Sequence, residues 1–287
     1  MAGDGQGKKQ DDDGDAKRGD KHGISEHEVE DIEELSTPRS PVIYEVVRRL
    51  GQEEMERPLV SLWWSGVAAG LSISFSLLAQ GILHEHLPDA PWRVLVVSLG
   101  YTVGFLIVVL GRQQLFTESN ITVVLPVLKD LTPSNVWRMS RLWVIVLVAN
   151  LAGTLFAAVF CTYFPVVPQD LYGAMLAISR EMAHLSWWQM CFHGVTSGFL
   201  IAAMVWMLPT AESAKLPVIA LMTWLIAVGG FTHVIAGSMD AYLLVFAGDW
   251  EWWRFITGFF LPVLIGNMVG GTALFALISY AQVMEEI

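Results

Sequence analysis

The sequence has little charge and almost no cysteine. Only 16 % of its 287 residues are charged, and the two cysteines, Cys161 and Cys191, both lie in apolar segments. Two cysteines are too few for a disulfide framework or a thiolate metal centre, so we expect inert buried thiols. The chain also lacks a phosphate-binding glycine loop, a dinucleotide fingerprint and a nucleophile elbow. The sequence therefore predicts neither an enzyme nor a resident cofactor or metal, and we expect no nucleic-acid partner.

Apolar residues are present in excess. They make up 54 % of the chain, and the mean hydropathy is +0.49, which is typical of an all-α integral membrane protein. The apolar residues are gathered in six windows, each long enough to cross a hydrocarbon core of about 30 Å. The sequence thus predicts a multi-pass protein of the cell (inner or plasma) membrane, in contact with lipid, whose domain 59–287 has six spans at 59–83, 94–128, 142–167, 185–208, 216–248 and 255–283.

The first 58 residues have a different composition. They hold more than half of the acidic side chains, and their beginning is rich in Gly, Asp and Lys. Such a segment buries too little apolar surface to offset chain entropy, so we predict that residues 1–58 form an acidic, largely disordered cytoplasmic tail rather than a signal peptide. Residues 41–57 predict an amphipathic helix at the membrane surface, and a charged linker fits them equally well.

The distribution of basic residues predicts the orientation of the spans. Cytoplasmic connections carry an excess of Lys and Arg. The connections on one side hold Arg48, Arg49, Arg57, Lys129, Arg138, Arg141 and Lys215, whereas those on the other side hold only Arg93, Arg180 and Arg254. Both termini are therefore expected in the cytoplasm.

The second and fifth windows are too long for single upright helices, which would reach about 50 Å. The sequence predicts interruptions at "LGRQQLFTESN" (110–120) and "GGFTHVIAGS" (229–238). Irregular backbone at membrane depth leaves peptide groups unpaired, and it is tolerated only inside protein or beside a watery cavity. Two broken helices therefore indicate a shared pore or binding site.

The two halves of the chain repeat each other. Three motifs recur in the same order: GVAAG (66–70) and GVTSG (194–198), FTE (116–118) and FTH (231–233), ANLAG (149–153) and GNMVG (266–270). Each half has three spans, an odd number, so the second half must be inverted, as in many channels and transporters. We expect the amides of Asn150 and Asn267 to bind the freed backbone of the broken helices.

Several charged residues stand near the breaks. Arg112 and Glu118 flank the first, and we interpret them as an ion pair that closes the loop, or as side chains that reach the surface. Asp240 follows the second break and is expected in the outer vestibule. Glu181 and His184 have the spacing of a metal-binding pair, but the second pair that a di-iron site needs is absent from the sequence.

Three motifs carry a family resemblance: L-F-T in the second span (Leu115, Phe116, Thr117), G-F-x-H in the fifth (Gly230, Phe231, His233) and I-G-N-x-x-G-G in the sixth (265–271). From about residue 60 to 283, the chain resembles the formate/nitrite transporter family. The resemblance implies an aquaporin-like protomer, a homopentamer with one pore per protomer, and passage of small monovalent anions with a proton.

The resemblance also implies a pathway. It places His233 between two apolar constrictions, with Thr117 across from it. The remaining pathway residues that it implies are Leu115, Phe116, Phe231, Tyr101, Phe105 and Ile226. The sequence departs from the family pattern at Thr232, Gly237 and Met182, where the family carries an acidic residue, an asparagine and a lysine, so the sequence is interpreted as a divergent branch.

A mechanism follows from His233, the histidine at the second break. A bare anion loses its hydration in an apolar constriction, whereas its neutral conjugate acid does not. We hypothesise that helix N-termini and Thr117 attract the anion and that a neutral His233 relays a proton or polarises the solute. Three alternatives remain: a core histidine bonded to a carbonyl, a channel for a neutral or cationic solute such as ammonium, and a sensor whose acidic tail binds a partner.

Overall fold

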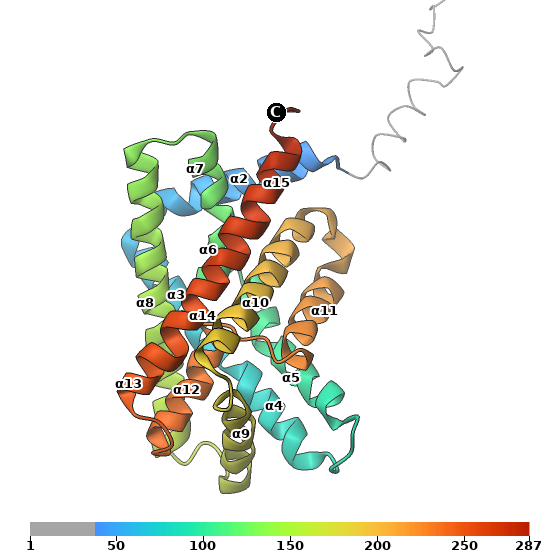
Figure 1. Cartoon of the computed structure of the whole chain (residues 1–287), viewed down its shortest axis with the longest axis vertical. Coiled ribbons are helices and arrows are strands. Elements are labelled where there is room, and N and C mark those ends of the chain that lie inside the picture. The colour runs from blue at the N-terminus through green and yellow to red at the C-terminus, as the bar shows by residue number, and fades with distance from the viewer. Residues whose placement is uncertain (1–37, 287) are drawn as a thin grey trace, which may run out of the picture. The chain divides into compact units, whose positions relative to one another are not determined.

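The computed structural model describes residues 38–286, and every element in this range is a helix (Figure 1). Most of the predicted acidic tail therefore lies outside the described residues. Among the described residues, five helices are long and apolar enough to cross a membrane: Leu59–His86, Arg93–Leu110, Pro133–Tyr163, Trp187–Thr210 and Trp252–Val283. The prediction of an all-helical membrane protein is confirmed.

The first, third, fourth and sixth spans are continuous or nearly so. The first is made of α3 (Leu59–Ile73) and α4 (Phe75–His86), the third is α8 (Pro133–Tyr163), and the fourth is α10 (Trp187–Met207), extended by the short helix η1 (Leu208–Thr210). The sixth runs through α13 (Trp252–Arg254), η3 (Phe255–Phe260), α14 (Leu261–Met268), η4 (Val269–Ala276) and α15 (Leu277–Val283), of which η3 and η4 are π-helical.

The second and fifth spans are broken, as predicted. In the second span, α5 (Arg93–Leu110) is followed by irregular backbone at 111–115 and then by α6 (Phe116–Thr122) and α7 (Val124–Lys129). In the fifth span, which follows the short helix η2 (Glu212–Ala214), α11 (Lys215–Val228) and α12 (Ala236–Phe246) are separated by residues 229–235. Neither α11 nor α12 is long enough to cross a membrane alone, so the fifth crossing needs both.

Two of the continuous spans begin at side-chain caps. Thr132 accepts a hydrogen bond from the backbone of Asn135 and precedes Pro133 at the start of α8. Ser186 and Gln189 form a capping box at the start of α10. These caps satisfy free N–H groups of the first turn and so fix where each span starts.

Helix α9 (Gln169–Met182) was not predicted. It lies between the third and fourth spans and packs against α4 and α12. Its buried residues, Leu171, Ala174, Met175, Leu176 and Ser179, fall on one face, and its other face is polar. An amphipathic helix of this kind does not form a continuous apolar window, so hydropathy alone does not predict it.

The two halves pack in the same way. Helix α3 lies against α8, and α10 lies against α14 and η4. The contacts need glycine: a Cβ at Gly66 would lie 2.7 Å from Cβ of Ala149, and a Cβ at Gly198 would lie 2.8 Å from Cα of Asn267. Since α2 leads into the first span and packs against the end of the fourth, these two spans run in opposite directions, as inverted repeats require.

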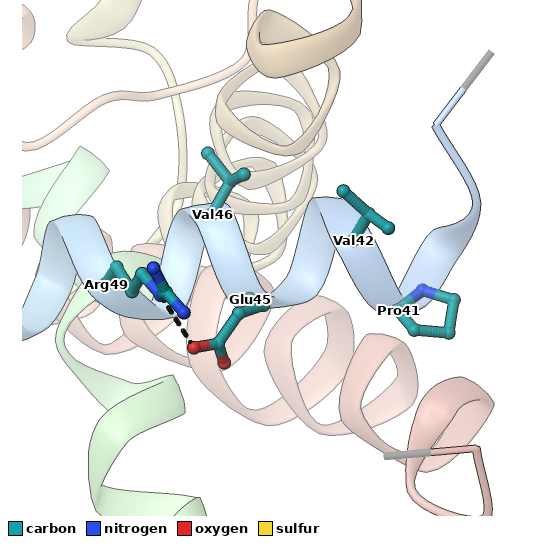
Figure 2. Close-up of a pocket in the computed structure, with 5 residues that line it drawn as sticks. All are labelled: Pro41, Val42, Glu45, Val46 and Arg49. Carbon is teal, nitrogen blue, oxygen red and sulfur yellow. Dashed lines mark hydrogen bonds and ion pairs between the residues drawn. The ribbon is translucent and has the colours of Figure 1, made fainter. Parts of the chain in front are cut away.

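Helix α2 (Ser40–Glu56) precedes the first span, at the same end of the bundle as α7 and α15 (Figure 1). It buries Tyr44, Val47, Gly51 and Met55, which share one face, against α6, α7 and α15. Its outward face forms a shallow pocket lined by Pro41, Val42, Glu45, Val46 and Arg49 (Figure 2), which contains none of the predicted pathway residues. A location of α2 at the membrane surface remains a prediction.

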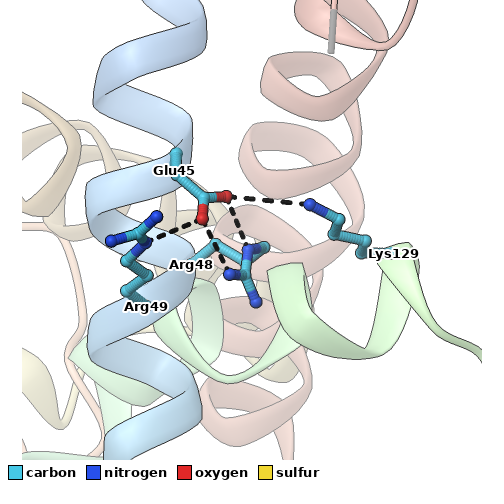
Figure 3. Close-up of polar contacts among 4 residues, drawn as sticks. All are labelled: Glu45, Arg48, Arg49 and Lys129. Carbon is cyan, nitrogen blue, oxygen red and sulfur yellow. Dashed lines mark hydrogen bonds and ion pairs between the residues drawn. The ribbon is translucent and has the colours of Figure 1, made fainter.

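Glu45 connects α2 to the end of α7. Its carboxylate accepts hydrogen bonds from Arg48 at 2.7 Å and Arg49 at 2.8 Å, and Lys129 lies 3.8 Å away (Figure 3). The Arg48 bonds are the main reason why the pKa of Glu45 is lowered to about 2. Glu45 is therefore ionised over the physiological pH range.

Candidate functional site

The first break is held by Asn150 of α8. Its side-chain oxygen accepts from the backbone N–H of Phe116 at 2.9 Å, and its Nδ2 donates to the carbonyls of Gln114 at 2.9 Å and Gly66 at 2.8 Å. Asn150 is fully buried. The amide therefore satisfies peptide groups that the interrupted helix leaves free, and ties them to the first span.

Asn267 of α14 does the same at the second break. Its oxygen accepts from the backbone N–H of Val234 at 2.9 Å, and its Nδ2 donates to the carbonyls of Thr232 at 3.2 Å and Gly194 at 2.9 Å. By these bonds, Val234 occupies the position in the second break that Phe116 occupies in the first. The repeated motifs of the sequence thus predict the two breaks correctly, but the F-T match pairs Phe116 with Phe231, three residues earlier, rather than with Val234.

His233 lies between the two halves. Its ring is 1 % exposed, and Nε2 lies 2.8 Å from Oγ1 of Thr117, at the start of α6. The other ring nitrogen, Nδ1, accepts from the backbone N–H of Ala236 at 3.1 Å. Because a backbone N–H can only donate, Nδ1 carries a lone pair and the hydrogen is on Nε2. The contacts thus define a neutral imidazole that donates to Thr117.

A row of rings extends from this pair along α5. Phe105 is fully buried and meets His233 edge to face, with centroids 5.2 Å apart. Tyr101, one turn away on the same helix, is half-buried with its ring centroid 5.1 Å from that of Phe105. Among the predicted pathway residues, the structure therefore connects His233, Thr117, Phe105 and Tyr101 through direct contacts.

The other predicted pathway residues are placed differently. Leu115 and Ile226 are fully buried. Phe116 turns its ring toward Trp143 of α8, with centroids 6.3 Å apart, and Phe231 meets His193 of α10 at 5.9 Å. The aromatic contacts of these two rings lead away from His233, so their place in a pathway remains a prediction.

Arg112 and Glu118 do not form an ion pair in the described part of the chain. Arg112 is exposed in a left-handed backbone conformation with φ of 50°, whereas Oε1 of Glu118 is buried and has no hydrogen-bond partner. The Arg112 side chain therefore faces the surface, whereas the Glu118 carboxyl group faces the interior. The interpretation of these residues as a loop-closing pair is therefore not supported by the geometry.

Helix α2 instead supplies polar groups to the first break. Oε2 of Glu54 accepts from Thr122 at 2.6 Å, and Arg57, which follows the helix, donates to the side chain of Gln114 at 2.8 Å. Burial raises the pKa of Glu54. The sequence did not indicate these contacts, although the acidic and basic residues within 41–57 were a signal that this helix has a polar partner.

Hydroxyl and imidazole groups around the second break were also missed. Ser197 donates to the Thr232 carbonyl, and Thr232 donates to the carbonyl of Met190 at 2.7 Å. His193 lies 3.0 Å from the carbonyl of Gly230 through Nδ1. In the sequence, the polar residues inside the apolar fourth span are the sign that this span bonds to a neighbouring break. Within residues 38–286, no three His, Cys, Asp or Glu side chains are grouped as metal ligands, and Glu181 and His184 are both exposed.

Comparison with known proteins agrees with the sequence motifs. The family model described as formate/nitrite transporter matches residues 41–281. The chain is 44 % identical over 259 residues to the inner membrane protein YfdC of Escherichia coli strain K12, covering 90 % of this chain and 84 % of the relative. It is 25 % identical over 242 residues to the formate channel FocA of Haemophilus influenzae, covering 75 % of this chain and 84 % of FocA.

Solved structures share the fold. A pentameric formate channel with formate bound has a TM-score of 0.67 at 22 % identity and matches 79 % of this chain and 98 % of its own. An FNT family ion channel has a TM-score of 0.72 at 19 % identity and matches 85 % and 98 %. The family resemblance and the multi-pass membrane architecture are thus confirmed. The chain belongs to the formate/nitrite transporter family.

Proposed function

We propose that this protein is a channel or secondary transporter, not an enzyme, and that it passes small monovalent anions of the formate and nitrite kind with a proton. Its family and the formate channels among its relatives support this substrate class. The observation that carries the mechanism is the neutral His233, buried between two broken helices and bonded to Thr117.

The proposed role of His233 and Thr117 is to help an anion cross the apolar part of the route as its neutral conjugate acid. An anion without its hydration shell is costly to place among Phe105, Ile226 and other buried apolar side chains, whereas its conjugate acid is not. Because Nε2 donates to Thr117 Oγ1, the hydroxyl hydrogen of Thr117 is available to a solute. The pair can therefore offer a polarised hydroxyl donor to the anion while the anion takes up a proton from water.

The remaining pathway residues are proposed as walls. Tyr101 and Phe105 would narrow the route on one side of the His233–Thr117 pair. Leu115, Phe116, Phe231 and Ile226 would form apolar walls elsewhere. Each is buried or half-buried, and substitutions to smaller residues would widen the route without changing its charge.

Assembly and orientation belong to the same proposal. We expect a homopentamer in lipid, as in the solved formate channel that shares this fold, with both termini in the cytoplasm. Light scattering of the purified protein would give the subunit number. Labelling of single cysteines, introduced at Lys129 and Asp89 of a cysteine-free chain, from one side of the membrane would give the orientation. Equal accessibility of both positions from outside the cell would contradict it.

A second candidate is a channel for ammonium or another cationic or neutral solute. The carboxyl groups of Glu118 and Asp240 near the two breaks favour it. A sensor that transports nothing is the third candidate.

Flux measurements distinguish these functions. Proteoliposomes would be tested with formate, nitrite and methylammonium between pH 5 and pH 8. We expect uptake of formate and nitrite that falls as pH rises, and loss of most of this uptake in His233→Asn. A variant that retains both the rate and the pH dependence removes His233 from the mechanism. Uptake of methylammonium alone identifies the cation channel, and absence of any flux identifies the sensor.

A further inference from the structure

A second pocket lies at the end of the bundle opposite α2, where α9 ends and α12 leads into α13 (Figure 1). Its volume is about 360 Å³. Among its lining residues, Arg180 and Arg254 are exposed, whereas Leu244 and Trp250 are buried. The lining includes none of the predicted pathway residues, so the function proposed above does not account for this pocket.

The guanidinium group of Arg254 is held in the pocket by two contacts. Its central carbon lies 4.9 Å from the centroid of the Trp250 ring, which is a cation–π distance. Nη2 donates to the carbonyl of Ala183, at the end of α9, at 3.1 Å. Nε and Nη1 form no hydrogen bond with any residue in 38–286. Arg254 is therefore fixed in place while part of its donor capacity stays unused.

Arg180 is oriented in a similar way by Asp249. Nε of Arg180 donates to Oδ2 of Asp249 at 2.8 Å. Within the described part of the chain, neither Nη atom of Arg180 has a hydrogen-bond partner, and the ring of His184, which also lines the pocket, has none. Unused N–H donors from two elements that are distant in sequence thus meet at one pocket.

The lining carries an excess of positive charge. It contains two guanidinium groups and one carboxylate, that of Asp249, so the net charge is one positive when His184 is counted as neutral. Glu181 and Glu251 are close in sequence but do not line the pocket. Guanidinium groups match the geometry of phosphate oxygens and bind them through paired N–H donors. A phosphate group with a single negative charge fits this lining best.

Exposed tryptophans border the pocket in the sequence. Two of them follow His184 and two precede Arg254: Trp187, Trp188, Trp252 and Trp253. Tryptophan is enriched where the hydrocarbon core of a membrane meets water, at the level of the lipid headgroups. The pocket therefore lies at the depth at which the phosphates of phospholipids are found.

We propose that this pocket binds a phosphate group and that an anionic phospholipid supplies it. Arg180 and Arg254 donate to the phosphate oxygens, and Asp249 and Trp250 position the two guanidinium groups. The ligand would link the end of α9 to the connection between α12 and α13, so its binding stabilises the folded protein. The inference does not depend on which solute the protein transports.

Lipid binding can be measured on the full chain in detergent. The thermal unfolding midpoint and native mass spectra would be recorded with dioctanoyl-phosphatidylglycerol, dioctanoyl-phosphatidylcholine or inorganic phosphate. We expect phosphatidylglycerol to form a complex and raise the midpoint, and phosphatidylcholine, whose headgroup has no net charge, to do so less. Arg254→Gln should weaken the affinity for phosphatidylglycerol about tenfold, the order expected for loss of one charge-assisted contact.

Matched variants separate the pocket from general surface charge. Arg254→Lys retains the charge but not the planar fork, and should lose part of the affinity. Arg138→Gln removes an exposed arginine near the start of α8, at the opposite end of the bundle, and should bind phosphatidylglycerol as wild type does (Figure 1). If Arg254→Gln does not assemble, Arg180→Gln provides the same comparison.

Each outcome supports or overturns the inference. Displacement of phosphatidylglycerol by an equal concentration of inorganic phosphate would support the phosphate site and identify free phosphate as its source. Unchanged affinity in both Arg254→Gln and Arg180→Gln would overturn the inference, and so would equal binding of the two lipids in wild type and variants. Failure to transport formate would contradict the proposed function and leave this result untouched.

Discussion

His233 and Thr117 are 116 residues apart in the chain, yet their side chains meet in a hydrogen bond of 2.8 Å between Nε2 and Oγ1. This bond joins the two broken helices across the repeat. The Thr117 hydroxyl accepts the hydrogen on Nε2 and is itself able to donate.

Replacement of Thr117 by Val should therefore reduce transport more than it reduces assembly. The change keeps the shape of the side chain, removes the acceptor of the Nε2 hydrogen, and leaves a buried donor unsatisfied at a cost of about 1–3 kcal/mol. We expect formate uptake in proteoliposomes to fall at least tenfold, about the effect of losing one positioned hydrogen bond. Thr117→Ser restores the hydroxyl and should recover most of the uptake. Equal rates in the Val and Ser variants would contradict the role of the hydroxyl.

Removal of either buried asparagine should destabilise the protein to a similar extent. Asn150→Ala or Asn267→Ala leaves a buried backbone N–H of a break, that of Phe116 or Val234, without its acceptor, at about 1–3 kcal/mol. The thermal unfolding midpoint in detergent should fall markedly in both variants. Asn135→Ala, at an exposed bond near the start of α8, is the control and should change it little. A large difference between the two buried sites would show that the repeats are not energetically equivalent.

The contact between α10 and α14 should not tolerate a methyl group. A Cβ at Gly198 would lie 2.8 Å from Cα of Asn267, so Gly198→Ala forces the helices apart. We expect loss of the assembled protein on size-exclusion chromatography. Gly173→Ala on α9, where a Cβ would meet nothing within 4 Å, should be neutral or stabilise the helix by about 0.5–1 kcal/mol. Normal assembly of Gly198→Ala would disprove the close packing.

The stability of helix α2 should depend on pH through Glu45, whose strongest bonds are to Arg48 and Arg49 of the same helix. Its pKa is lowered to about 2 from an ordinary value of 4.5, so its stabilising effect is complete above pH 4.5 and is lost as pH falls toward 2. At pH 7, Glu45→Gln should lower the thermal unfolding midpoint and speed hydrogen exchange in residues 40–56. The difference between the variant and wild type should shrink below pH 4.5. A difference that grows on acidification would refute this assignment.

The positions of the helices were largely predictable from hydropathy. The second window, 94–128, matches α5 to α7 within one residue, and the fifth window matches α11 and α12 within two. Both breaks were found because their windows are longer than a membrane is thick. The chemistry around them was less predictable: the hydrogen-bond register of the breaks, the approach of Glu54 to Thr122 and the bond from Ser179 to Asp240 all join residues that are distant in sequence. No local pattern encodes such pairings. Helix α9 was missed for a different reason, since only one of its faces is apolar.

The backbone N–H of Ala236 has a consequence for proton movement. It occupies the lone pair of Nδ1 while it starts α12, so a proton could be added to that nitrogen only by breaking the bond that helps to begin the helix. The imidazole is consequently left with a single hydrogen, on Nε2, which points to Thr117. The ring can polarise a passing solute through that hydroxyl but has no spare proton to give, so the proton that neutralises an anion has to arrive with it from the water on the side of entry.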